Sequence, residues 1–164
     1  MLNDVHAWTR NYNVNCIHNL QFDSFPIKVK RMLIESVESL RKVAAEFAVG
    51  IKAPKCVALY GDLGAGKTEF ARAVIQSLRG AGTIVPSPTF TLVQEYPGVG
   101  GNISHFDLYR IKDERELEEI GFFDALAKNI TLIEWPEVAK KFLPVDTIHV
   151  RIVVKDGGRG LLWQ

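Results

Sequence analysis

Eight residues, Gly61–Thr68, fit the pattern G-x-x-x-x-G-K-[ST], in which glycines let successive backbone N–H groups turn toward one point. An apolar run, Cys56–Tyr60, enters this segment directly, and apolar residues at helical spacing follow it until Gly80. The order is strand, loop and helix, so the segment predicts an α/β domain. The amino end of the helix would face a bound anion.

The loop predicts a nucleoside triphosphate with Mg²⁺ as its ligand. Lys67 would meet the β- and γ-phosphates, and the Thr68 hydroxyl would reach Mg²⁺, because this hard cation prefers oxygen ligands. The alternative is a glycine-rich turn before an ordinary helix. The residues expected to bind the nucleotide are Leu63, Gly64, Ala65, Gly66, Lys67 and Thr68.

Two acidic residues end apolar runs, where a carboxylate would lie near the metal. Glu134 follows Ile130–Ile133, and we expect it to hold Mg²⁺ directly or through a water. Asp107 follows Ile103–Phe106, and we expect it to orient or deprotonate the attacking water. The alternative for each is a strand-end acid that caps a neighbouring helix or lies in solvent.

Further candidates lie near these acids. The segment 86–91 places hydroxyls between prolines, so a threonine there could sense the γ-phosphate, although a proline-stiffened turn is the alternative. Arg110 could neutralise charge in the transition state or be an ordinary surface arginine. His105 is interpreted as a packed or solvated histidine rather than a base, and Trp135 as a residue that closes the core.

The remaining pattern predicts an α/β domain with a mixed, mainly parallel sheet flanked by helices. We expect a helix from the N-cap Ser36 to Gly50 and antiparallel strands at 89–96 and 103–107, since six residues between them are too few for a parallel crossover. A charged helix over 113–120 and a last strand over 147–154 complete the expectation. The charged helix is either a solvated face or an acidic surface for a partner.

Length and composition favour one domain over residues 31–164, with an N-terminal arm of unknown role over residues 1–30. Lys and Arg number 20 against 19 for Asp and Glu, so no global charge favours DNA or an anionic membrane. No apolar stretch approaches the roughly 20 residues of a membrane span. Two cysteines, Cys16 and Cys56, make no disulfide framework, and we expect a cytoplasmic protein.

Together these segments resemble the TsaE (YjeE) family of small bacterial ATPases. Besides the loop 61–68, the resemblance lies in a switch segment at 87–93, an acidic motif at 105–110 and Glu134-Trp135-Pro136. It covers about residues 36–154 and implies a P-loop NTPase-like three-layer sandwich. It further implies that Lys67 and the loop amides hold ATP, that Thr68 and Glu134 serve Mg²⁺, and that Asp107 and Thr89 belong to hydrolysis or switching.

The resemblance also implies partners. Members act with TsaD and TsaB proteins in threonylcarbamoyladenosine modification of tRNA, so tRNA would be met only indirectly, and ATPase activity would be weak without the partners. A small-molecule kinase is the alternative, although the chain has no arginine cluster that would form a lid. A GTPase is a third, and the chain has no Asn-Lys-x-Asp motif.

Overall fold

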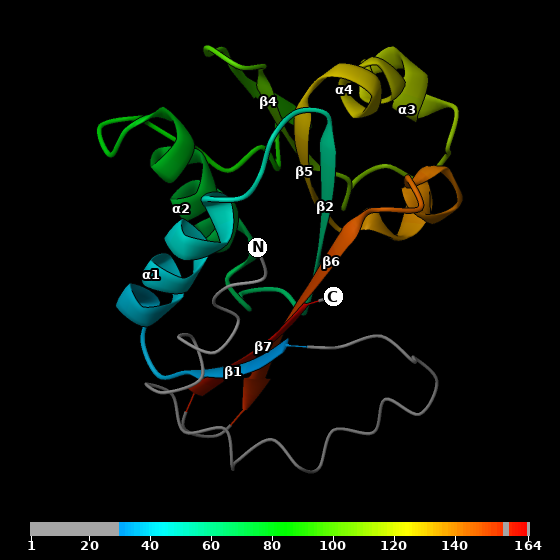
Figure 1. Ribbon diagram of the computed structural model, residues 1–164. Coiled ribbons are helices and arrows are strands. Elements are labelled where there is room, and N and C mark those ends of the chain that lie inside the picture. The colour runs from blue at the N-terminus through cyan, green and yellow to red at the C-terminus, as the bar shows by residue number, and fades with distance from the viewer. Residues whose placement is uncertain (1–29, 156–157, 164) are drawn as a thin grey trace.

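The computed structural model describes residues 30–155 and 158–163, and Figure 1 shows one sheet with helices on both of its faces. The sheet has seven strands in the order β1-β7-β6-β2-β5-β4-β3. The strands are β1 (Lys30–Ile34), β2 (Lys55–Tyr60), β3 (Val93–Tyr96), β4 (Ile103–Asp107), β5 (Ile130–Glu134), β6 (Ile148–Lys155) and β7 (Gly158–Trp163).

The sheet is mixed. Its central strands β6, β2, β5 and β4 run parallel, whereas β1 and β7 on one side and β3 on the other pair antiparallel. Parallel strands must be covered on both faces, and the burial of every residue of β4 and β5 agrees with that rule. The predicted α/β class with a mixed, mainly parallel sheet is confirmed, as is the antiparallel pairing of β3 with β4.

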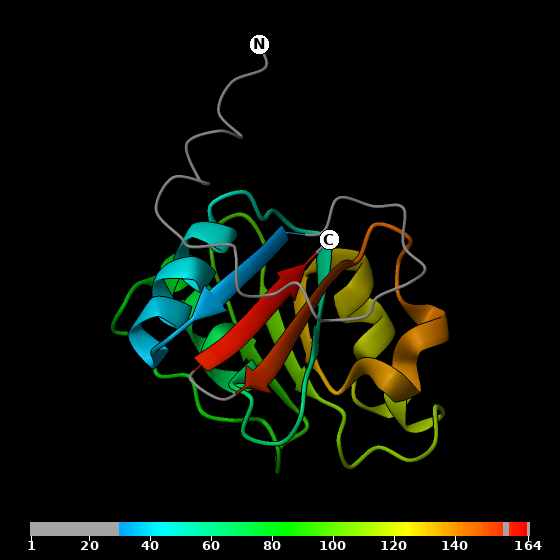
Figure 2. The ribbon, with the colours of Figure 1, turned by 90° about the horizontal axis from the view of Figure 1, so that it is seen from below.

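Helices form the two outer layers of the sandwich (Figures 1 and 2). One face carries α1 (Val37–Ala48) and α2 (Lys67–Arg79), which share a core cluster with the inward side chains of β2 and β5. The other face carries α3 (Glu116–Glu119), α4 (Phe122–Lys128) and the 3₁₀ helix η3 (Pro136–Phe142), packed over a second cluster. Three layers result, as the sequence predicts.

The two long helices begin and end where their capping residues predict. The Ser36 hydroxyl accepts a hydrogen bond from the Ser39 backbone N–H and caps α1. Gly80 follows α2, and its N–H donates to the carbonyl of Gln76. Both elements agree with the expected boundaries.

Two expected elements are shorter than the sequence pattern indicates. The strand expected over 89–96 begins only at Val93, because residues before it form a turn in which the Leu92 N–H donates to the Pro88 carbonyl at 2.7 Å. Leu92 has φ 66°, which no strand accommodates. The helix expected over 113–120 is reduced to α3, because the Glu116 carboxylate accepts the N–H groups of Lys112 and Asp113 in a preceding turn.

Strands β1 and β7 are absent from the expectation, and β6 is therefore not the last strand. The two pair with each other and extend the sheet beyond β6. A Cβ on Gly158 would lie 2.9 Å from the Ile34 carbonyl oxygen, so glycine permits this close approach. The arm expected over residues 1–30 lies outside the described residues up to 29, and its division from a single domain stays a prediction.

Of the two cysteines, Cys56 lies in β2 and is buried without a disulfide, and burial raises the pKa of its thiol to about 11. Cys16 lies outside the described residues. Among the helices of the described chain, none is long and apolar enough to cross a membrane.

Candidate functional site

The three central strands β2, β5 and β4 bring the predicted site residues to one edge of the sheet. Because these strands are parallel neighbours, their carboxyl ends lie together. Glu134 stands in register with Leu59 of β2 on one side and with Asp107 of β4 on the other. The loop 61–68 leaves β2 at the same edge and opens α2.

The loop requires glycine at two positions for different reasons. Gly61 has φ 143°, and a Cβ there would lie 2.4 Å from the carbonyl oxygen of Ile152. Gly66 has φ 111° and occupies the N-cap position of α2. Arg159 of β7 holds the loop from outside, since its Nε donates to the Ala65 carbonyl at 2.9 Å. The backbone therefore makes the tight turn that a helix-terminal anion site needs.

Lys67, the first residue of α2, is only 5% exposed and folds back over its own loop. Its Nζ donates to the carbonyls of Gly61 at 2.6 Å and Asp62 at 2.9 Å, and lies 3.7 Å from the centroid of the Trp135 ring. Burial lowers the pKa of the Lys67 amine, whereas the charges of Glu134 and Asp107 oppose that shift. A phosphate oxygen could replace the two carbonyls as acceptor.

Thr68 and Glu134 form the oxygen pair that could hold a metal ion. The Thr68 Oγ1 donates to Glu134 Oε2 at 2.9 Å, and the other oxygen, Oε1, lies 2.9 Å from Nε2 of His105. A hydroxyl and a carboxylate suit Mg²⁺, which takes few protein ligands and completes its octahedron with water and phosphate. Within the described residues no cluster of three or more His, Cys, Asp or Glu forms, so a closed all-protein metal cage is absent there.

Asp107 and Thr89, both expected at the site, are hydrogen-bonded to each other. The Thr89 Oγ1 donates to Asp107 Oδ2 at 2.7 Å, and the Tyr109 backbone N–H donates to Oδ1 at 3.0 Å. The Ser87 hydroxyl lies 2.9 Å from that of Thr89 and extends the chain of hydroxyls toward the surface. Asp107 is 4% exposed, so its carboxylate is held rather than free in solvent.

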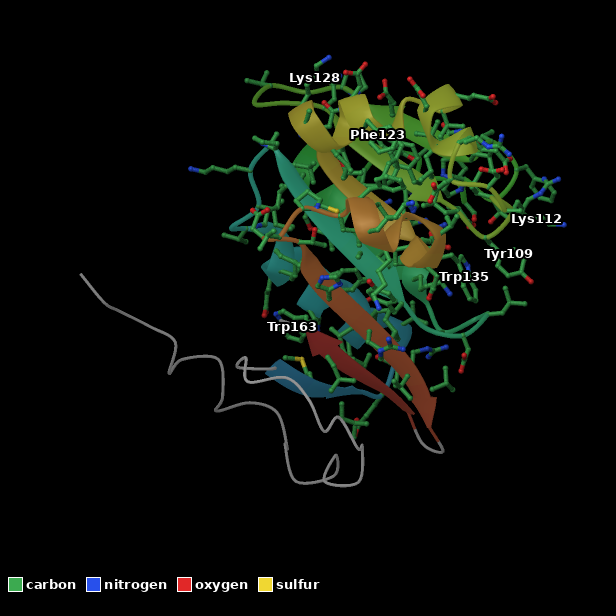
Figure 3. The ribbon with its side chains drawn as sticks, turned by 90° about the vertical axis from the view of Figure 1, so that its right-hand side faces the viewer. Tyr109, Lys112, Phe123, Lys128, Trp135 and Trp163 are labelled. Carbon is green, nitrogen blue, oxygen red and sulfur yellow. The ribbon has the colours of Figure 1, made fainter. Side chains whose placement is uncertain are left out.

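Large side chains stand exposed around the buried centre. Leu63 is 82%, Phe90 85% and Tyr109 58% exposed. Figure 3 shows Tyr109 close to Trp135, and their ring centroids are 4.9 Å apart. Arg110 is exposed, and its guanidinium carbon lies 5.8 Å from the centroid of the Phe90 ring. Its suggested part in neutralising charge in the transition state stays a prediction.

Two neighbours of the site make contacts that the sequence does not indicate, although His105 is packed, as the sequence predicts. His105 is fully buried against Glu134, and Trp135 is half-buried under the Lys67 amine rather than closing the core. A signal for His105 was present, since it lies two residues before Asp107 and the period of a strand puts both on one face. For Trp135 the chain offered none, because its φ of 55° sets the ring direction.

Comparisons with known proteins agree with this arrangement. The model of the family described as "Threonylcarbamoyl adenosine biosynthesis protein TsaE" matches residues 34–160. Among relatives named "tRNA threonylcarbamoyladenosine biosynthesis protein TsaE", that of Rickettsia bellii is 41% identical over 129 residues, covering 79% of this chain and 90% of its own. That of Bacillus subtilis is 35% identical over 125 residues, covering 76% and 74%.

A solved structure supports the same likeness. The crystal structure of Bacillus subtilis YdiB superimposes with a TM-score of 0.69 at 27% identity and covers 85% of this chain and 87% of that one. This likeness, together with the sheet and its flanking helices, confirms the predicted P-loop NTPase-like fold.

Proposed function

The chain belongs to the TsaE family and thereby to tRNA threonylcarbamoyladenosine biosynthesis, and from this premise we propose that it is a Mg²⁺-dependent ATPase. In the proposal it binds and hydrolyses ATP and acts on a complex of TsaD- and TsaB-type proteins, meeting tRNA only through that complex. The proposed location is the cytoplasm, where the free thiol of Cys56 would stay reduced.

One observation carries the proposal. The Thr68 hydroxyl, at the start of α2, is hydrogen-bonded to the Glu134 carboxylate, and Asp107 stands in register beside Glu134 with Thr89 bonded to it. A glycine-rich turn, a hydroxyl–carboxylate oxygen pair and a second carboxylate thus share one sheet edge. Phosphoryl transfer needs this set, because its catalysis rests on positioning and on charge stabilisation.

The loop residues, with Thr68 and Glu134, would bind and orient the substrate. Loop amides from Leu63 to Thr68 and the Lys67 ammonium would bind the phosphates, with Lys67 leaving the carbonyls of Gly61 and Asp62. Thr68 and Glu134 would hold Mg²⁺, which when bound supplies positive charge against the phosphate oxygens.

Asp107, with its neighbour Thr89, would accept the proton of the attacking water. Asp107 Oδ2 accepts from Thr89 and Oδ1 from the Tyr109 N–H, and each oxygen keeps a lone pair for one more donor. A water in that position would lose its proton to Asp107 while its oxygen bonds to the γ-phosphorus and the bond from that phosphorus to the bridging oxygen breaks, releasing ADP and inorganic phosphate. Because Thr89 neighbours the exposed Phe90, a partner that covers Phe90 could shift Thr89 and so change the rate.

Nucleotide turnover tests the proposal in three settings: the chain alone, with candidate small-molecule acceptors, and with a TsaD–TsaB pair. We expect slow Mg²⁺-dependent release of phosphate from the chain alone and faster release with the pair. A phosphorylated small molecule would instead establish the kinase alternative, and absence of turnover in all three settings would contradict the proposal.

A further inference from the structure

We infer that His105 is a positioning residue that fixes the Glu134 carboxylate for the metal, an inference that rests on the proposed function. Its imidazole Nε2 lies 2.9 Å from Glu134 Oε1, and both side chains are buried. The sequence pattern alone favours a packed or solvated histidine at this position. The contact gives it a defined one.

The two residues meet because of strand register. His105 of β4 pairs with Leu132 of β5, so Glu134 is two residues further along the neighbouring strand on the same face. That face is the one covered by α2, since Leu132 and Ile103 belong to the core cluster of α1 and α2. The Glu134 side chain therefore contacts His105 of the neighbouring strand and Thr68 at the start of α2.

The two carboxylate oxygens have different partners. An ionised carboxylate only accepts, so Nε2 carries the proton and donates to Oε1, while Oε2 accepts from Thr68. With one donor on each oxygen, the plane of the carboxylate is fixed and Oε2 is kept beside the hydroxyl that would share the metal. Partners behind a metal ligand commonly orient it in this way.

The burial of His105 argues against a purely space-filling part. The side chain is fully buried, and its other nitrogen, Nδ1, has no hydrogen-bond partner in the described part of the chain. A buried polar atom without a partner costs stability, and a leucine of similar size would avoid that cost. The hydrogen bond to Glu134 is the contribution that histidine makes and leucine could not.

The effect of the contact is measurable as magnesium coupling, the ratio of the ATP dissociation constant in EDTA to that in excess MgCl₂. This ratio reports how strongly the metal and the nucleotide assist each other. We expect His105→Leu to reduce the ratio by about 10-fold or more, as other losses of outer partners reduce metal affinity. Its dissociation constant for ATP in EDTA should stay within about twofold of the wild type, since the loop is unchanged.

Two variants make the test specific. His105→Gln keeps an N–H donor at the reach of Nε2 and should restore the ratio to within about threefold of the wild type. Thr131→Val removes a different buried hydrogen bond, from Thr131 Oγ1 to the Ala125 carbonyl at 3.0 Å, and should leave the ratio unchanged. Calorimetric titration of ATP into the full chain gives each constant, and circular dichroism checks folding.

Each possible result either supports or overturns the inference. A ratio unchanged in a folded His105→Leu, or a His105→Gln that behaves like leucine, overturns the inference while leaving the proposed function intact. A wild-type chain with no coupling overturns the proposed function and the inference with it. If His105→Leu does not fold, His105→Asn takes its place, because the amide donor of asparagine stops one atom short of the position of Nε2. His105→Asn should lose the magnesium coupling that His105→Gln keeps. Equal ratios for these two variants would overturn the inference.

Discussion

Glu134 and Asp107 stand side by side at the ends of neighbouring parallel strands, but the structure holds them in different ways. Glu134 is bonded to Thr68 of α2 and to His105 of β4, both within regular elements. Asp107 is bonded to Thr89, which belongs to a turn beside the exposed Phe90. We call these the metal side and the water side of the site.

The difference indicates how binding and hydrolysis can be controlled separately. The metal side is anchored by the sheet and α2, so it should bind nucleotide whether or not a partner is present. The water side depends on a turn whose Ser87 and Phe90 side chains are exposed, and segments with few buried contacts change conformation at low cost. A partner could therefore alter turnover through Thr89 without changing nucleotide affinity.

The largest expected effect comes from changing Asp107 on the water side. Asp107→Asn keeps the shape of the side chain but removes the base, so turnover of ATP should fall by about 10²–10⁴-fold. The dissociation constant for Mg²⁺·ATP should stay within about threefold, because the metal side is untouched. Phosphate release and calorimetry measure the two quantities. Asp124→Asn, at a carboxylate 78% exposed on α4, is the control; intact turnover in Asp107→Asn would refute its assignment.

The next effect sharpens the contrast in packing. Phe106, adjacent to Asp107, is 1% exposed and its ring lies 5.3 Å from that of Phe122, so Phe106→Ala should lower the free energy of unfolding by about 3–5 kcal/mol. Phe90, adjacent to Thr89, is 85% exposed, so Phe90→Ala should change it by less than about 0.5 kcal/mol. Urea unfolding measures both. Similar losses for the two variants would show that the Thr89 turn is as well packed as the strand.

A third change acts on the metal side. Glu134→Gln retains the shape but not the charge, and should weaken ATP binding in MgCl₂ by at least as much as His105→Leu does, about 10-fold or more, with little change in EDTA. Calorimetry in the two buffers measures this, with Glu137→Gln, an exposed acid nearby, as the control. Equal weakening in both buffers would mean that Glu134 shapes the loop rather than serving the metal.

The smallest expected effect concerns His149, which lies outside the metal side and the water side, and the dependence of folding stability on pH. Burial, together with the charge of Lys140, lowers the pKa of His149, whose Nδ1 lies 3.0 Å from the Tyr60 hydroxyl. The unfolded chain then binds a proton more readily than the folded one, so stability is full above about pH 6.5 and decreases as the pH falls below it.

His149→Gln should therefore make the melting temperature slightly less dependent on pH below about 6.5. Melting curves at several pH values between about 5 and 8 show the difference between the two proteins. A wild-type slope identical to that of His149→Gln would contradict the assignment of this histidine.

Much of the site follows from local pattern. The loop, Glu134 and Asp107 could be located because each follows or ends an apolar run, whereas Thr89 was singled out only through the resemblance to the TsaE family. Strand β7 could not be found in this way, since Gly158 and Gly160 interrupt it and its pairing with β1 joins distant parts of the chain. The turn before β3 was missed because a leucine, Leu92, takes a positive φ.

The most direct test of the account is a calorimetric titration of Mg²⁺·ATP into the purified chain, alone and beside a TsaD–TsaB pair. We predict heat with one-site stoichiometry, lost in Lys67→Ala, because the Lys67 amine and the loop amides would grip the phosphates. No heat from the wild-type chain, even beside the pair, would contradict the claim that this sheet edge binds a nucleotide.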